Sequence, residues 1–156
     1  MCDNVTNAPN LGSLFRIADA FGIEKLILCG DNISIGRKIA KTSRATEKVL
    51  QYDICESVLK VVDDLKSKNY QIISLEITDS SEPIHSFKFS NKKPIAIIIG
   101  DENFGVSEAV LKKIKKLNKK YFIIDFSKNN KFKKDTNSNR ISIGKFGKII
   151  HLIKEK

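Results

Sequence analysis

The chain has 156 residues, of which 41% are hydrophobic and 29% charged, and its net charge is +10. This length suits one compact domain, and the composition excludes the disordered and fibrous classes of protein. No apolar run approaches the roughly 20 residues that span a bilayer, and no signal peptide is recognisable, so we expect a cytoplasmic protein with no membrane partner.

Cysteine and histidine are the residues that a disulfide framework or a metal site would use. The cysteines, Cys2, Cys29 and Cys55, are odd in number and show no paired spacing, and the two histidines are isolated. We therefore expect buried or incidental thiols in a reducing compartment, with no metal bound.

Strands and helices alternate along the chain. In chain order the pattern predicts a helix over 14–22 closed by Gly22, a buried strand over 24–30, a turn or short helix over 36–49 and a strand over 49–54. It then predicts a helix over 55–69 closed by Asn69, a strand over 70–77, a polar loop over 78–93 and a buried strand over 94–102. The last predicted elements are a helix over 107–117 capped by Ser107, a strand over 120–126 and a helix over 141–154. This alternation predicts an α/β fold, a mostly parallel sheet flanked by helices, in one domain over residues 1–156.

Ligands of such sheets bind beyond the carboxyl ends of the strands. Three loops expected at this edge, 3–13, 100–107 and 127–142, are rich in Asn, Gly, Ser and acidic residues. We therefore look for the chemistry of the protein in these loops.

The first loop combines turn-forming residues with side chains that can bind a ligand. Pro9 and Gly12 predict an unusual backbone turn, and Asn10 can cap a helix amide or offer its side-chain amide to a ligand. Arg16 lies six residues beyond Asn10, less than two helical turns, so the two can converge at the start of the helix. The alternative is that Arg16 forms a salt bridge with a carboxylate such as Asp19.

The second loop reads GDENFGVS. Gly100 ends the strand and lets another group approach the backbone, Glu102 lies at the strand tip, and Gly105 permits the turn. The alternative is a tight strand-to-helix turn with a capping acid. No dinucleotide-type G-x-G-x-x-G is present.

The positive charge is concentrated at the end of the chain. Residues 112–156 hold 15 Lys and Arg against 3 Asp and Glu, a net charge of +12, whereas the preceding residues carry −2. A lysine run such as 111–120 is also what a solvated helix face looks like. A block of this length and charge favours a surface that meets polyanionic phosphate.

These motifs resemble those of the SpoU (TrmH-like) family of RNA 2′-O-ribose methyltransferases, within the SPOUT class of knotted proteins. The first family motif matches Asn10, Gly12, Arg16, Ala18, Phe21 and Gly22. The second matches Gly100, Glu102, Gly105, Val106 and Ser107. The segment 38–49 also resembles the Lys-Thr-Ser segment that follows the second strand of the family, so the resemblance covers nearly the whole chain.

Two regions depart from the family pattern. Ile124, Asp125 and Phe126 replace Ile-Pro-Met, and SNRIS at 138–142 replaces the serine motif, after a longer loop with four lysines. The family begins with a buried strand before the Asn loop, of which this chain has almost nothing before Asp3. We therefore expect a sheet that could lack its first element.

The third motif can be aligned in two ways. Keeping the apolar register aligns Ser138, Ile141 and Ser142 with family positions and puts Arg140 where Asn is expected. A shift of two residues offers Asn139 instead, at the expense of the apolar pattern.

The resemblance implies methyl transfer from S-adenosyl-L-methionine to a ribose 2′-hydroxyl of tRNA or rRNA. It gives Arg16 the role of base toward the hydroxyl, or of a phosphate grip that orients it, with Asn10 positioning Arg16 or the ribose and Glu102 holding the loops of the site. It implies main-chain cofactor contacts, without a metal, from a set of residues with small or apolar side chains: Leu75, Gly100, Ile124, Ser138 and Ile141.

The resemblance also implies a C-terminal trefoil knot and a homodimer. Without an appended RNA-binding domain in the sequence, we expect the basic C-terminal block to hold a compact RNA by its phosphates, which favours tRNA over rRNA. The alternatives are a non-catalytic RNA-binding protein that retains the knot, favoured by the divergent third motif, and an unrelated nucleotide-binding protein of flavodoxin-like topology.

Overall fold

The computed structural model describes residues 1–78, 81–83, 87–117 and 124–125. Within these ranges, strands and helices follow one another largely as the sequence predicts, except that a short strand lies in the segment 78–93 predicted as a polar loop. The strands are β1 (Cys2–Asp3), β2 (Leu26–Cys29), β3 (Tyr52–Cys55), β4 (Gln71–Ser74), β5 (Glu82–Pro83), β6 (Ile95–Gly100) and β7 (Ile124–Asp125). The helices are α1 (Ala8–Ala20), α2 (Arg37–Ser43), α3 (Val58–Ser67) and α4 (Glu108–Leu117), with a 3-10 turn at Thr46–Lys48.

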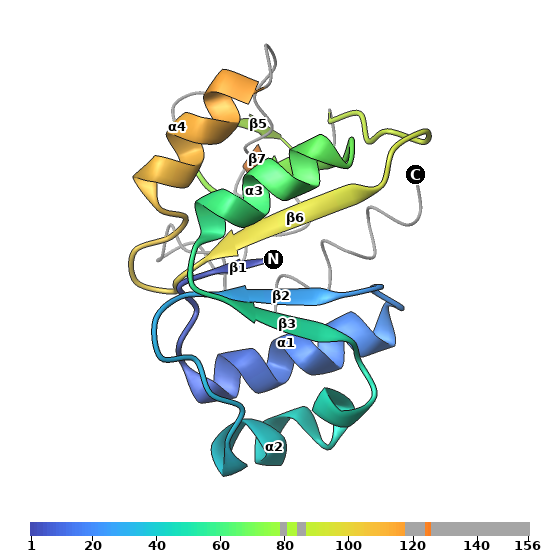
Figure 1. Cartoon of the computed structure of the whole chain (residues 1–156), viewed down its shortest axis with the longest axis vertical. Helices are drawn as coiled ribbons and strands as arrows, with labels where there is room; N and C mark the ends of the chain where they lie inside the picture. The colour runs from blue at the N-terminus through green and yellow to red at the C-terminus, as the bar shows by residue number, and fades with distance from the viewer. Residues whose placement is uncertain (79–80, 84–86, 118–123, 126–156) are drawn as a thin grey trace.

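Five strands form one parallel sheet in the order β3-β2-β1-β6-β4, and β5 pairs with β7 in a separate parallel ribbon. The mostly parallel α/β fold is therefore confirmed (Figure 1). The predicted last helix over 141–154, the predicted knot and most of the predicted strand over 120–126 lie outside the described residues.

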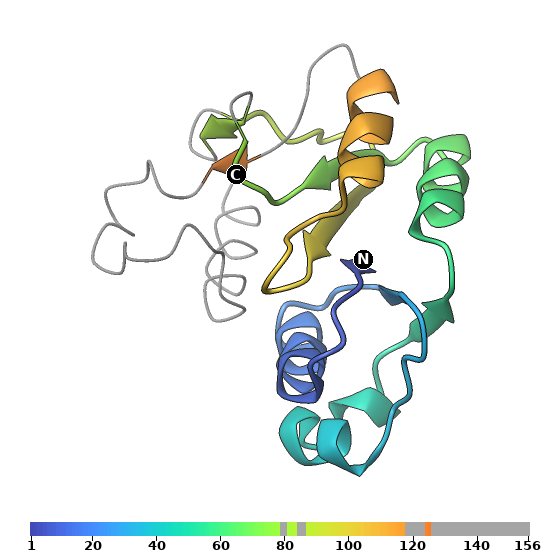
Figure 2. The same ribbon diagram turned by 90° about the vertical axis from the view of Figure 1, so that its left-hand side faces the viewer.

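The sheet separates two hydrophobic cores, with α1 and α2 on one side and α3 and α4 on the other (Figure 2). One core joins α1 and α2 to Ile73 and Ile99, and the other joins α3 and α4 to Ile72 and Ile98. Successive residues of a strand point to opposite faces, so β4 and β6 contribute to both cores. This explains the continuous apolar run of β6, because a parallel strand covered on both faces has no side exposed to water.

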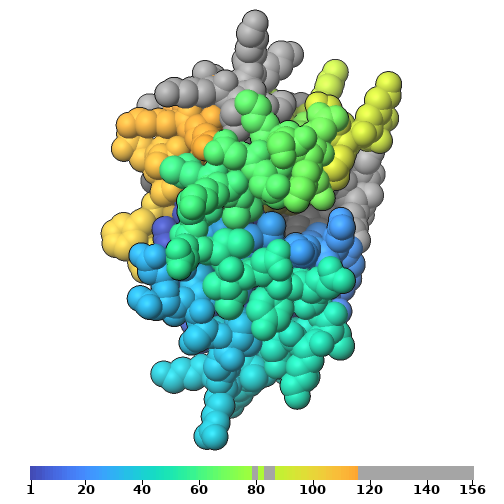
Figure 3. Space-filling model, in the orientation of Figure 1, coloured from blue at the N-terminus to red at the C-terminus, as the bar shows by residue number. Residues whose placement is uncertain are grey.

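Strand β1 is short but central. Cys2 pairs with Leu28 on one side and Ile99 on the other, and the Met1 amino group donates to the Ile97 carbonyl at 2.7 Å. A hollow of about 250 Å³ lies beside Met1 between β2 and β6, and the space-filling view shows it between the two halves of the molecule (Figure 3). The sheet thus keeps its first element at the carboxyl end, where the predicted site lies.

Helix α1 begins earlier than the sequence pattern predicts. Asn7 is its N-cap and accepts the Asn10 amide at 3.2 Å, so the predicted loop ends at this cap and Gly12 is helical. A Cβ on Gly12 would lie 2.5 Å from the Thr42 Cβ, so this glycine allows α1 and α2 to approach closely. The predicted backbone turn at Gly12 is therefore wrong. Gly22, with φ of 55°, ends the helix as predicted.

Candidate active site at the carboxyl edge of the sheet

Three segments meet where β1, β4 and β6 end. The Ser107 amide donates to Oδ2 of Asp3 at 2.8 Å, and the Val106 amide donates to Oε2 of Glu76 at 2.8 Å. Asp3 directly ends β1 and is only 1% exposed, whereas Glu76 lies two residues beyond β4. Two carboxylates from different strands therefore fix the second family motif at the start of α4, where amide groups have no helical partner.

The loop that carries the second motif is also rigid within itself. Asp101 Oδ1 accepts the amides of Asn103 and Phe104 at 2.7 and 3.0 Å, and the main chains of Asp101 and Gly105 exchange hydrogen bonds of 3.0 and 2.8 Å. A Cβ on Gly100 would lie 2.0 Å from the Gly105 carbonyl carbon, and Gly105 has φ of 71°. The predicted roles of the two glycines, close approach and a turn, are confirmed.

Glu102 lies at the tip of this loop with one carboxylate oxygen buried. Within the described part of the chain, Oε2 of Glu102 has no hydrogen-bond partner, and the same holds for the buried Oγ of Ser74. A buried acceptor without a donor costs roughly 1–3 kcal/mol, and more when it is charged. Glu102 is therefore an acceptor for which a ligand or another segment can supply the donor.

Asn10 and Arg16 both belong to α1. Six residues correspond to about 9 Å of rise and about 120° around the helix axis, so their side chains do not stack as an i, i+4 pair does. Arg16 is exposed and forms no ion pair with Asp19 or with any other residue in the described ranges. The salt-bridge alternative for Arg16 is thus not observed, and its guanidinium is open to an anionic ligand.

The five residues predicted to line the cofactor site are only partly described. Leu75 is 4% exposed, and its amide donates at 2.9 Å to the carbonyl of Ile98, two residues before Gly100 in the neighbouring strand β6. Ile124 begins β7 and pairs with Glu82 of β5. Ser138 and Ile141 lie outside the described residues.

Sequence reasoning missed three residues of this edge. Glu76 could have been found because it is an acid near the end of the strand predicted over 70–77, whereas no strand was predicted before Asp3. Phe104 is 89% exposed at the loop tip, and an aromatic residue between the glycines of a ligand-binding motif was the available signal.

The buried thiols take no part in this arrangement. Burial raises the pKa of the Cys2 thiol to about 11 and that of Cys29 to about 12, so both are protonated at neutral pH. A protonated thiol is neither a nucleophile nor a good metal ligand. In the ranges that the structure describes, no cluster of three or more His, Cys, Asp and Glu side chains could hold a metal ion, and no helix is long and apolar enough to cross a membrane.

A parallel α/β sheet whose carboxyl edge carries an Asn/Arg helix and a Gly-x-Glu-x-x-Gly loop defines the class of SpoU-like proteins. The chain belongs to the SpoU rRNA Methylase family, whose model matches residues 1–125. Over 109 residues it is 27% identical to a putative TrmH family tRNA/rRNA methyltransferase of Staphylococcus haemolyticus, covering 69% of this chain and 43% of that protein. Over 105 residues it is 26% identical to the 23S rRNA (guanosine-2′-O-)-methyltransferase RlmB of Ralstonia nicotianae, covering 67% and 41%.

Solved structures share the fold at lower identity. The TrmH/SpoU tRNA modifying enzyme of A. aeolicus superposes with a TM-score of 0.76 at 18% identity, over 99% of this chain and 72% of that chain. The SpoU methyltransferase AviRb of Streptomyces viridochromogenes, solved with its cofactor AdoMet, gives 0.75 at 20% identity, over 96% and 54%. This chain spans about two-fifths of the length of the curated relatives above.

Proposed function

We propose that this chain is the catalytic domain of an S-adenosyl-L-methionine-dependent methyltransferase that acts on a ribose 2′-hydroxyl of RNA. The observation that carries the proposal is the pairing of Asp3 and Glu76 with the amides of Ser107 and Val106, which holds the second family motif in a fixed loop at the edge where the first motif begins. Fixed main-chain geometry at this edge is what positions a cofactor and a substrate for reaction.

The residues present fit the cofactor. Gly100 has no side chain, so the main chain of Gly105 packs against it and fixes the loop, and the buried Leu75 lies just after the neighbouring strand β4. Within the described residues the buried Oε2 of Glu102 has no hydrogen-bond partner, which suits a ligand that carries positive charge and N–H donors. S-adenosyl-L-methionine supplies the electrophilic methyl group, and Ile124, Ser138 and Ile141 complete the proposed main-chain site.

Arg16 and Asn10 act on the RNA in this proposal. A ribose hydroxyl is a weak nucleophile at neutral pH, so the site must orient it and take its proton. The exposed Arg16 guanidinium, with no ion pair among the described residues, is suited to grip a phosphate and to orient the hydroxyl, or to accept its proton as a base. Asn10, in the first turn of the same helix, positions the ribose, since its side chain does not lie beside that of Arg16.

The substrate we favour is tRNA over rRNA, bound by a homodimer. The supporting features are the net charge of +12 over residues 112–156 and the exposed aromatic ring of Phe104, which can stack on a base. A C-terminal trefoil knot is part of this proposal. The divergent third motif favours a second candidate, a non-catalytic RNA-binding protein that retains the knotted fold.

Transfer of labelled methyl groups tests this function directly. The protein is incubated with S-adenosyl-L-methionine and, separately, with total tRNA and with rRNA, and labelled nucleosides are identified after digestion. We expect label in a 2′-O-methylnucleoside of tRNA. Label found only in rRNA overturns the substrate choice, label on a base overturns the ribose assignment, and RNA binding without label supports the non-catalytic candidate.

A further inference from the structure

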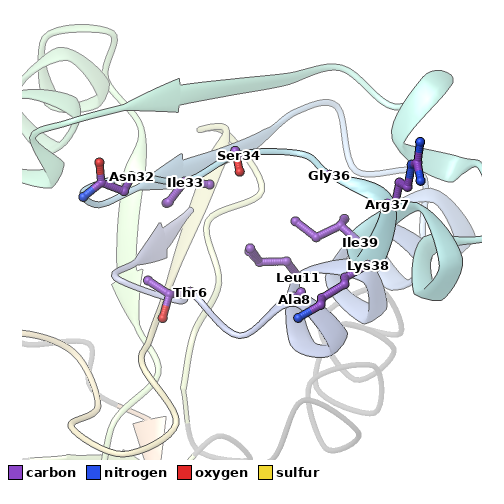
Figure 4. Close-up of a pocket in the computed structure, with 10 residues that line it drawn as sticks. All are labelled: Thr6, Ala8, Leu11, Asn32, Ile33, Ser34, Gly36, Arg37, Lys38 and Ile39. Carbon is purple, nitrogen blue, oxygen red and sulfur yellow. The ribbon is translucent and has the colours of Figure 1, made fainter.

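A pocket of about 290 Å³ lies beside the first turn of α1, between this helix, the loop after β2 and the start of α2 (Figure 4). Its floor is apolar: Leu11 and Ile39 are 2% and 3% exposed, and Ile33 is half-buried. Leu11 directly follows Asn10 of the first motif. The pocket therefore adjoins the residues that we propose contact the ribose.

The rim of the pocket is polar. Its side chains, Thr6, Asn32, Ser34 and Lys38, are exposed and form no hydrogen bond or ion pair with any residue in the described ranges. Figure 4 shows Lys38 reaching toward the Ala8 side of the pocket, whereas Arg37 points away from it. Donors, acceptors and one cation therefore surround an apolar floor, and none of these side chains is engaged by another residue that the structure describes.

We propose that this pocket binds one nucleotide of the substrate RNA, a neighbour of the modified one; this inference rests on the proposed function. The apolar floor suits a base taken out of the stack, the amide and hydroxyl groups suit the edges of a base or a 2′-hydroxyl, and Lys38 suits the phosphate. The volume of about 290 Å³ lies just below the usual range for pockets that bury a whole ligand, which suits one nucleotide of a longer chain.

Gly36, the N-cap residue of α2, offers a position where bulk can be added to the pocket wall without a clash. It lines the pocket, has φ of −103°, and a Cβ built on it meets no atom within 4 Å. Any residue can adopt this backbone conformation. Gly36→Leu therefore adds bulk at the pocket wall, and Gly36→Ala is the matched control, since one methyl group leaves most of the space open.

The test measures RNA affinity and cofactor affinity of the same variants. Fluorescence anisotropy with labelled unfractionated tRNA and with rRNA fragments gives the first, and calorimetric titration with S-adenosyl-L-methionine gives the second. Losing the contacts of one bound base should weaken RNA binding of Gly36→Leu about tenfold or more, with Gly36→Ala close to wild type. Cofactor affinity should be unchanged in both variants.

Lys38 provides a second arm that does not depend on Gly36→Leu folding. Lys38→Ala should weaken RNA binding and lower the slope of log K against log salt by about 0.7 to 0.9, the release of one counterion. Lys41→Ala, one turn further along α2 and outside the pocket, is the charge-matched control and should change less.

Equal RNA affinity and salt slope in wild type, Gly36→Leu and Lys38→Ala would overturn the pocket assignment and leave the proposed function standing. Failure of the wild type to bind either RNA would overturn both. If Gly36→Leu lost cofactor binding as well as RNA binding, that result would also count against a nucleotide pocket, because the pocket would then belong to the cofactor site.

Discussion

The two sides of the carboxyl edge differ in how their polar groups are used. On the α4 side, Asp3 and Glu76 each accept a main-chain amide of the second motif. On the side of α1 and α2, the side chains of Thr6, Asn32 and Ser34 have no hydrogen-bond partner among the described residues. The loop on the α4 side is therefore preorganised by its own contacts, as a cofactor loop must be. The side of α1 and α2 keeps its donors and acceptors for a ligand.

The largest effect should come from the open side. Arg16→Ala should reduce methyl transfer by about 10²-fold or more, because the ribose then loses the group that orients it. Stability should change by no more than about 0.5 kcal/mol, since Arg16 is exposed and has no ion pair in the described ranges. Steady-state transfer assays and thermal melting measure the two quantities. Asp19→Ala on the same helix is the control, and equal losses in both variants would contradict a role for Arg16 on the substrate.

On the preorganised side, the strongest effect should come from Gly100→Ala. The new Cβ would lie 2.0 Å from the Gly105 main chain, so the loop must move away from the strand end. We expect a loss of about 3 kcal/mol in the free energy of unfolding and loss of cofactor binding. Chemical denaturation and calorimetry check this. Gly36→Ala, where a Cβ meets open space, should leave both quantities near wild type, and an equally stable Gly100→Ala variant would be evidence against the tight loop.

Removal of one carboxylate should have a smaller effect. Glu76→Ala leaves the Val106 amide without its acceptor and should cost about 1–3 kcal/mol and weaken cofactor binding. Glu76→Gln retains an acceptor oxygen and should recover part of both losses. A Gln variant as impaired as the Ala variant would show that the negative charge, and not the hydrogen bond, holds the loop.

The smallest effect concerns the buried thiol of Cys2 in β1. The pKa of Cys2 is raised by burial from 9.0 to about 11, so the folded state prefers the protonated thiol. This preference is fully present below pH 9 and is lost as pH rises toward 11, so unfolding becomes easier by about 1 kcal/mol near pH 10. Denaturation from pH 8 to 10.5 measures the trend, and Cys2→Ala should flatten it. An unchanged slope in that variant would assign the trend to other groups.

How far the sequence predicted this structure can be seen from individual residues. The periods of apolar residues located β2, β3, β4, β6, β7 and the helices, because burial on one or two faces leaves a repeating trace. The short strand β5 lies in the segment predicted as a polar loop. Because Asn7 caps α1, the helix begins at Ala8, before Leu14, where the predicted helix starts. Gly12 was misread because a glycine needed for helix packing and a glycine needed for a turn look the same in one sequence.

The candidate site was predictable where a motif is local and not where it joins distant segments. Gly100, Glu102 and Gly105 lie in one loop, and their spacing already indicated the turn. Glu76 binds a residue 30 positions away and Asp3 one 104 positions away, contacts that depend on strand order and register. The pocket beside α1 could not be foreseen either, because it forms between two segments that only the packing of α1 on α2 brings together.

Calorimetric titration of S-adenosyl-L-methionine into the unmodified protein tests directly whether the preorganised side of the edge holds this cofactor. We expect binding in the micromolar range, with a matching rise in melting temperature at saturating ligand and no dependence on added metal. Absence of both heat and thermal shift at millimolar ligand would contradict it and favour the non-catalytic RNA-binding candidate.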